Sequence, residues 1–215
     1  MELTKQQIQS IEHYLNVKNI TYIDVRFEIL DHIVSDIEEI INTENKTFNS
    51  ALEEVKQKWN PQLKETSSMY FGLGFTAPKM IIVKAKKIYT KYYLILLTSY
   101  FLPLLVLTHF DFTIQNPSED FLFLISKIFI VLCIIAFLVM FLKKENKVET
   151  TYGFILKTQG LGLFVGLFTV LIFMTKPKEL NGINIGLFCT FAFSTYSYFH
   201  FYKKHQYAIK KFKAL

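Results

Sequence analysis

Three side chains that could bind a metal ion follow one another on a single predicted helix. Glu28, His32 and Asp36 are spaced i, i+4 and i+8, which places two carboxylates and an imidazole on one helical face. Such groups are zinc ligands, but one helix offers at most two adjacent ligands to one ion, and the first 62 residues contain no cysteine. We therefore predict no metal and no cofactor at this row.

The same helix also carries further acidic residues, and together they suit a protein partner. The first 78 residues hold 12 acidic and 7 basic side chains, a net charge of −5. Direct binding of nucleic acid is not expected, because the soluble part of the chain is its acidic part. A plain solvated face is the alternative reading. The candidate partner-binding residues are Glu28, Asp31, His32, Asp36 and Glu39.

No known catalytic motif is present in the sequence. The glycine pair in GLGF, at Gly72 and Gly74, lacks the third glycine and the lysine of a phosphate-binding loop. There is no G-x-S-x-G, no H-E-x-x-H and no pairing of cysteine with histidine. The chain is therefore predicted not to be an enzyme.

Three helical segments precede the apolar part of the chain. Thr4 and Gln7 have the spacing of a capping box, and a second helix is predicted over residues 22–42. A third runs over residues 50–59, and Asn60 with Pro61 is predicted to end it. The apolar stripe of the second helix is predicted to comprise Ile23, Phe27, Leu30, Val34, Ile37 and Ile41. Residues 1–62 thus form a three-helix module, which is so small that we expect it to dock on something else.

Four apolar stretches fill the second half of the sequence, each about twenty residues long, the length of a helix that crosses a bilayer. They cover residues 92–110, 121–142, 154–174 and 183–202. Because lipid offers no partners for backbone amides, such segments must be helical. The predicted fold is all-α, with a hinge and basic juxtamembrane helix over 63–91 and a four-span bundle with a basic tail over 92–215.

Lysines predict the orientation of these spans, since positively charged short flanks stay in the cytoplasm. Five lysines precede the first predicted span, three lie between the second and third, and five follow the fourth, whereas the first connection has none and the third has two. With four spans, this bias places the N-terminus, the C-terminus and the middle loop in the cytoplasm. No cleavable signal peptide is expected, so the first span would direct insertion.

The N-terminal part resembles a known family. The segments YIDVRFEILDHIVSDIEEII and TFNSALEEVKQKWNP, joined by a short polar connection, resemble the HAAS signalling domain, a cytosolic three-helix module of bacterial membrane proteins. In that family the second helix closes in a Gly-Asp-Pro turn, from which Trp59, Asn60 and Pro61 depart. Members are often encoded beside PadR-type transcriptional regulators. The resemblance implies a regulatory adaptor in a bacterial cytoplasmic membrane with such a regulator as its partner.

Several residues near or within the predicted spans have two readings each. Lys127 is either a functional intramembrane charge or a side chain that snorkels to the headgroups. Residues 79–91 either lie on the membrane surface or extend the first span, and the absence of a helix breaker between Pro78 and Pro103 favours the extension. Candidate hinges are Gly72, Gly74 and Pro103. Gly162 and Gly166 have the small-xxx-small spacing of close helix packing, within the chain or in a homo-oligomer.

We therefore interpret the chain as a non-enzymatic membrane protein with a regulatory or sensory adaptor role, which couples its spans to a cytosolic partner through the acidic module. The rival interpretation is an accessory membrane subunit of a transporter. The absence of a polar stripe along the spans argues against a solute path within one chain.

Overall fold

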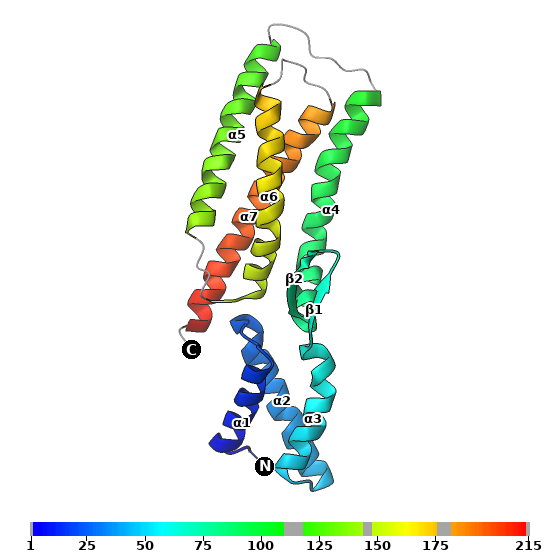
Figure 1. Cartoon of the computed structure of the whole chain (residues 1–215), viewed down its shortest axis with the longest axis vertical. Coiled ribbons are helices and arrows are strands. Elements are labelled where there is room, and N and C mark those ends of the chain that lie inside the picture. The colour runs from blue at the N-terminus through cyan, green and yellow to red at the C-terminus, as the bar shows by residue number, and fades with distance from the viewer. Residues whose placement is uncertain (1, 110–117, 144–147, 176–181, 214–215) are drawn as a thin grey trace. The chain divides into compact units, whose positions relative to one another are not determined.

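The computed structural model describes residues 2–109, 118–143, 148–175 and 182–213, and they are mostly helical, as predicted (Figure 1). The chain divides into two compact units. Unit 1 comprises Met1–Lys87, Asn146–Phe154 and His205–Leu215, and unit 2 comprises Ile88–Glu145 and Ile155–Lys204. Unit 1 is therefore larger than the predicted module 1–62 and includes segments from three parts of the chain.

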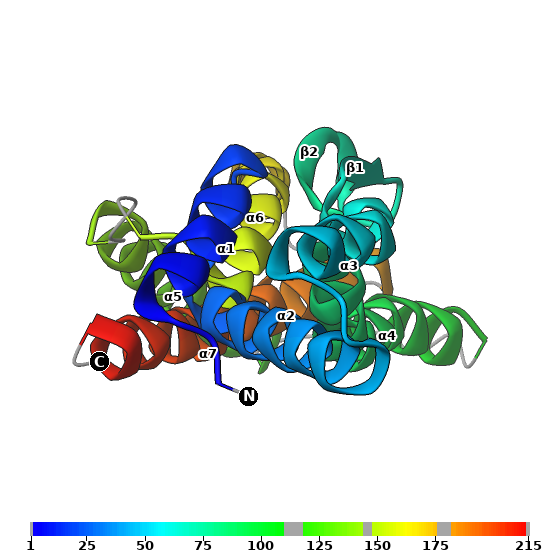
Figure 2. The same ribbon diagram turned by 90° about the horizontal axis from the view of Figure 1, so that it is seen from below.

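The first three helices of unit 1 are α1 (Lys5–Val17), α2 (Ile23–Glu44) and α3 (Phe48–Leu63). Thr4 and Gln7 form the predicted capping box at the start of α1. The α2 helix packs against both α1 and α3, as the view in Figure 2 shows. The helices bury the apolar side chains Ile11, Leu15, Val25, Ile29, Ile33, Ile37, Ala51 and Val55.

Two sequence predictions about these helices are wrong. Of the predicted stripe on α2 only Ile37 is fully buried, and Phe27 is 45% exposed. Apolar residues cover more than one face of α2, and the face that α1 and α3 enclose is the one with Val25, Ile29 and Ile33. Pro61 also does not end α3, which continues to the fully buried Leu63. A proline in the last turn costs few hydrogen bonds, and burial of Leu63 offsets that loss.

A two-stranded antiparallel hairpin follows, where the sequence predicts a hinge or an interfacial loop and no regular element. β1 (Glu65–Ser68) pairs with β2 (Gly72–Pro78) from Glu65 opposite Pro78 to Ser68 opposite Gly72. Gly72 has φ +92°, a conformation that glycine adopts without strain. Phe71 and Ala77 are buried, so the hairpin packs against the rest of unit 1.

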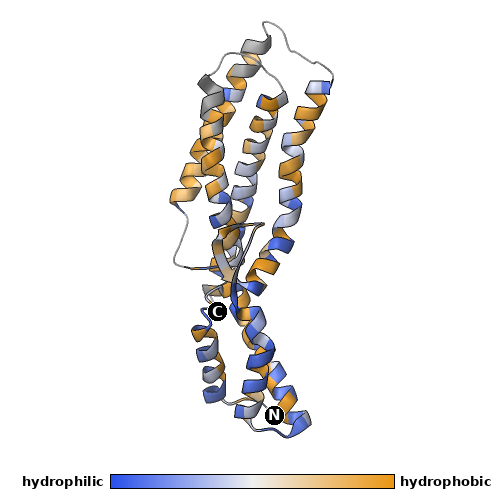
Figure 3. Cartoon of the chain, turned by 45° about the vertical axis from the view of Figure 1, so that its right-hand side comes forward, coloured by the Kyte–Doolittle hydropathy of each residue, from blue (hydrophilic) through white to orange (hydrophobic). Residues whose placement is uncertain are grey.

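The remaining helices are α4 (Lys79–His109), α5 (Ser118–Leu142), α6 (Thr151–Thr175) and α7 (Gly182–Lys213). The α4 helix is continuous, so residues 79–91 extend the first apolar stretch, as favoured from the sequence. Among the described residues, two helices are long and apolar enough to cross a membrane: α4 and Leu124–Leu142 within α5. Their apolar composition is visible in Figure 3. The other two predicted spans stay predictions.

Within unit 2, α4 and α7 form an antiparallel pair. The ring centroids of Tyr92 and Phe201 are 4.8 Å apart. The Ser99 hydroxyl donates to the Thr190 hydroxyl oxygen at 3.4 Å. At Gly186 the helices come so close that a Cβ would lie 2.8 Å from the Tyr100 carbonyl oxygen. A second contact region joins α5, α6 and α7 through the aromatic side chains Phe137, Phe141, Phe164 and Tyr198.

Candidate functional site

The start of α2 is hydrogen-bonded to the segment that leads into α6. The Ile23 amide donates to the Glu149 carbonyl oxygen at 3.0 Å, and the Thr21 hydroxyl donates to the Glu149 carboxylate. Both oxygens of Asp24 accept from the Thr151 amide, at 2.9 and 3.1 Å. We name this junction, formed by Thr21, Ile23 and Asp24 with Glu149 and Thr151, the clasp. It joins residues that are about 127 positions apart in the sequence.

The clasp also caps α6. The Thr150 hydroxyl accepts from the Gly153 amide at 2.9 Å, as a helix N-cap does, and Asp24 of α2 adds a second acceptor at the same helix end. A carboxylate is favourable there because a helix N-terminus carries partial positive charge. Thr150 and Thr151 are both fully buried. The first turn of α6 is thus stabilised by a side chain from the N-terminal module.

His205, near the end of α7, completes this region. It is 1% exposed, and its Nδ1 lies 2.8 Å from the Thr150 hydroxyl oxygen. Gly153 makes room for the imidazole, because a Cβ at that position would lie 3.1 Å from Cε1 and 3.2 Å from Nδ1 of His205. The ends of α6 and α7 therefore meet through a glycine and two polar side chains.

Aromatic contacts and charge extend the clasp region to the hairpin and to the end of α7. Phe71 packs edge-on against Phe154 at 5.2 Å, and Phe27 stacks on Phe212 at 5.9 Å.

Burial raises the pKa of Tyr22 far above its usual range, and the negative charges of Glu149, Glu65 and Asp24 raise it further. Tyr22 is therefore neutral at physiological pH.

Sequence reasoning missed this region almost entirely. In the sequence, Asp24 is one of several acidic residues on the second predicted helix, and nothing relates it to Thr151. The one local signal is a threonine, Thr150, directly before an apolar helical segment, which is a typical N-cap pattern.

The predicted acidic row is placed on α2, but the structure engages three of its five members within unit 1. Asp36 accepts from Lys58, with both oxygens at 2.9 Å, and from the Trp59 indole at 2.9 Å. His32 stacks on Trp59, with ring centroids 6.4 Å apart. Glu28 forms a salt bridge with Lys84 at 2.9 Å. These contacts stabilise the module and leave less of the row for a partner.

Asp31 and Glu39 are the two members of the row that take no part in these contacts. Both are exposed, and neither forms an ion pair with any residue in the described ranges. Among the same residues, no group of three His, Cys, Asp or Glu side chains lies close enough to hold a metal ion.

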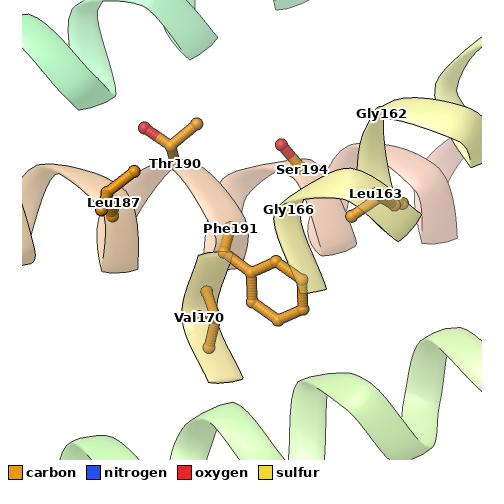
Figure 4. Close-up of a pocket in the computed structure, with 8 residues that line it drawn as sticks. All are labelled: Gly162, Leu163, Gly166, Val170, Leu187, Thr190, Phe191 and Ser194. Atoms are coloured by element: carbon orange, nitrogen blue, oxygen red, sulfur yellow. The ribbon is translucent and has the colours of Figure 1, made fainter. Parts of the chain in front are cut away.

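In unit 2, Gly162 and Gly166 line a pocket between α6 and α7 with a volume of about 90 Å³ (Figure 4). A Cβ at Gly162 would meet nothing within 4 Å, and one at Gly166 would be 3.5 Å from the Phe191 ring. A Cβ would come closer to a neighbouring helix at Gly182 and Gly186 of α7, at 3.1 and 2.8 Å from backbone atoms of α4. The pocket is lined by Gly162, Leu163, Gly166, Val170, Leu187, Thr190, Phe191 and Ser194.

The candidate hinges differ in their surroundings. Gly72 follows the turn of the hairpin. A Cβ added at Gly74 would meet no atom within 4 Å. Pro103 lies inside α4. A Cβ added at Gly182 would lie 3.1 Å from the Pro103 carbonyl oxygen. Lys127 is half-buried on α5. A hinge role for these glycines and this proline stays a prediction, as does a functional role for Lys127.

Comparison of the chain with protein-family models, with curated proteins and with solved structures gives no match.

Proposed function

We propose that the protein is a non-enzymatic regulatory or sensory membrane protein, in which α4 to α7 cross a bacterial cytoplasmic membrane and unit 1 is the cytosolic adaptor. The observation that carries the proposal is the clasp. Asp24, in the acidic helix that would meet a partner, directly caps the first turn of α6. A change at that end of α6 would thus alter α2.

The surface of unit 2 supports a position in the bilayer. Large apolar side chains on three helices face outward: Leu105 of α4 is 63% exposed, Leu132 of α5 58% and Leu161 of α6 63%. Polar groups such as Thr195 and Ser197 are instead buried. Monomeric soluble proteins rarely expose large apolar patches, whereas lipid chains would cover exposed apolar side chains at no cost.

The path of the chain supports coupling between the two units. The α4, α6 and α7 helices each have residues in both units. A ligand or stimulus that favours one arrangement of the spans can shift the adaptor only through such shared elements. The clasp joins α6 to the N-terminal module, and the contact of His205 with Thr150 joins α7 to the start of α6.

The partner we propose is a cytosolic protein with a basic surface. Asp31 and Glu39 are exposed acids of α2 that form no ion pair among the described residues, and complementary charge favours association with a basic patch. The resemblance of residues 4–62 to HAAS domains suggests a PadR-type regulator as that protein.

In-cell crosslinking of the full-length tagged chain tests this proposal. The variant Asp31→Lys/Glu39→Lys reverses the exposed charges and should lose most of a captured soluble regulator. Glu12→Lys, at an exposed position of α1, is the control and should retain it. Equal capture by all three forms would contradict the adaptor role. Capture of only membrane proteins, unaffected by the charge reversal, would instead favour an accessory transporter subunit.

A further inference from the structure

Three lysines and a histidine gather at one end of the α4–α7 pair in unit 2. The Tyr92 ring of α4 lies 5.4 Å from the His200 ring and 4.8 Å from that of Phe201, which holds the two helical turns together. Lys91 directly precedes Tyr92 on α4, and Lys204 follows His200 by about one turn of α7. We name Lys91, His200, Lys203 and Lys204 the lysine cluster.

The positive charge of this cluster is not neutralised within the described residues. The α7 helix and residues 88–109 of α4 contain no Asp or Glu. None of the three lysines forms an ion pair in the part of the chain that the structure describes, and all three are exposed.

Aromatic rings hold two of the ammonium groups in place. Lys91 Nζ lies 5.2 Å from the Tyr92 ring centroid, and Lys203 Nζ lies 4.2 Å from that of Phe199. A ring face contacts one side of an ammonium group, so N–H donors remain for an anion. Preorganised ammonium groups with unused donors are suited to bind phosphate.

The cluster lies where the apolar surface of the pair ends. Within unit 2, the outward aliphatic side chains of α4 begin at Leu94, which is 57% exposed, within one turn of Lys91. On the part of α7 in unit 2, the last exposed apolar side chain is Phe199, 41% exposed, one turn before Lys203. Tyr93 and Tyr196 are exposed at 38% and 58% beside them. Tyrosine rings next to lysines are typical of the headgroup level of a bilayer.

We propose that the lysine cluster binds the phosphate of an anionic phospholipid headgroup in the cytoplasmic leaflet. The inference rests on the proposed function only in that α4 and α7 must cross the bilayer. Each lysine near an anionic surface strengthens binding by about fivefold. Loss of both lysines beside His200 should therefore weaken binding by about twenty-five-fold.

The test uses the full-length protein in nanodiscs of equal parts phosphatidylglycerol and phosphatidylcholine, with the retained lipids identified by native mass spectrometry. The wild-type chain should retain phosphatidylglycerol preferentially, and Lys91→Gln/Lys204→Gln should lose at least tenfold of that preference. Lys5→Gln/Lys64→Gln removes the same charge at exposed positions of unit 1 and should behave as wild type. Lys91→Arg/Lys204→Arg keeps the charge and should retain the lipid, which distinguishes a lost site from a misfolded protein.

Two outcomes would overturn the lipid site. One is equal retention of phosphatidylglycerol by the glutamine variant and the wild type. The other is its displacement by inorganic phosphate at matched concentration, since the cluster would then recognise the free anion. Flotation with vesicles of pure phosphatidylcholine tests the membrane position separately. A chain that does not float contradicts the proposed function, whereas one that floats without lipid preference contradicts only this inference.

Discussion

At the scale of single residues, Gly153 controls how closely His205 can approach the start of α6. We expect Gly153→Ala to destabilise the protein, because the new Cβ would lie 3.1 Å from a buried imidazole that has little room to move. Crowding of this kind costs about 1–3 kcal/mol, and the better helix propensity of alanine offsets about 0.5–1 kcal/mol of it. The measurement is the thermal unfolding midpoint of the purified full-length protein.

Gly162→Ala is the matched control for this prediction. It makes the same change in the same helix at a position where a Cβ meets nothing within 4 Å, so it should be neutral or stabilising. In a His205→Ala background the penalty at Gly153 should disappear. A penalty of equal size in both backgrounds would show that the crowding does not involve the imidazole.

Asp24 offers a second prediction at the residue scale. Asp24→Asn keeps an acceptor oxygen but removes the charge at the N-terminus of α6, and should cost about 0.5–1 kcal/mol. Asp24→Ala also removes the hydrogen bonds and should cost about 1–2 kcal/mol. Hydrogen exchange at the Thr151 amide, compared with an amide in the middle of α6, reports the local effect. Unchanged exchange at Thr151 in the alanine variant would mean that the clasp is not formed.

At the scale of elements, the α4–α7 pair depends on the glycines of α7. Gly186→Ala should force the two helices apart, because its Cβ would lie 2.8 Å from the backbone oxygen of Tyr100, and backbone cannot rotate away. The expected loss is about 1–3 kcal/mol in the stability of the purified protein. Gly160→Ala, on α6 with no atom near the new Cβ, serves as the control. Equal stability of the two variants would contradict the close approach of α4 and α7.

The elements also show where sequence reasoning succeeds. The capping box at Thr4 and the continuity of α4 follow from local sequence, because their hydrogen bonds join neighbours in the chain. The hairpin was missed because its strands are short and its glycines were read as breakers. The buried face of α2 was misassigned because several faces are apolar, and only the positions of α1 and α3 select one. The clasp requires contacts between distant polar residues, which no periodicity encodes.

At the scale of the whole molecule, the number of spans is the property that most of the proposals share. Four spans place the start of α7 outside the cell, whereas two spans, α4 and α5 alone, would leave it in the cytoplasm. Ile183 is 49% exposed near the start of α7 and is a suitable position for a single cysteine. In a background with Cys133 and Cys189 replaced by alanine, we expect Ile183→Cys in intact cells to react with a membrane-impermeant maleimide.

Two further cysteine variants make this labelling decisive. Ser118→Cys, at the start of α5, should react from outside in either topology, which shows that the reagent reaches the protein. Glu39→Cys, exposed on α2, should react only after the cells are opened, because unit 1 is proposed to be cytosolic. If Ile183→Cys follows Glu39→Cys, α6 and α7 do not cross the membrane. Their apolar surfaces would then need a protein partner, since such surface is not stable in water.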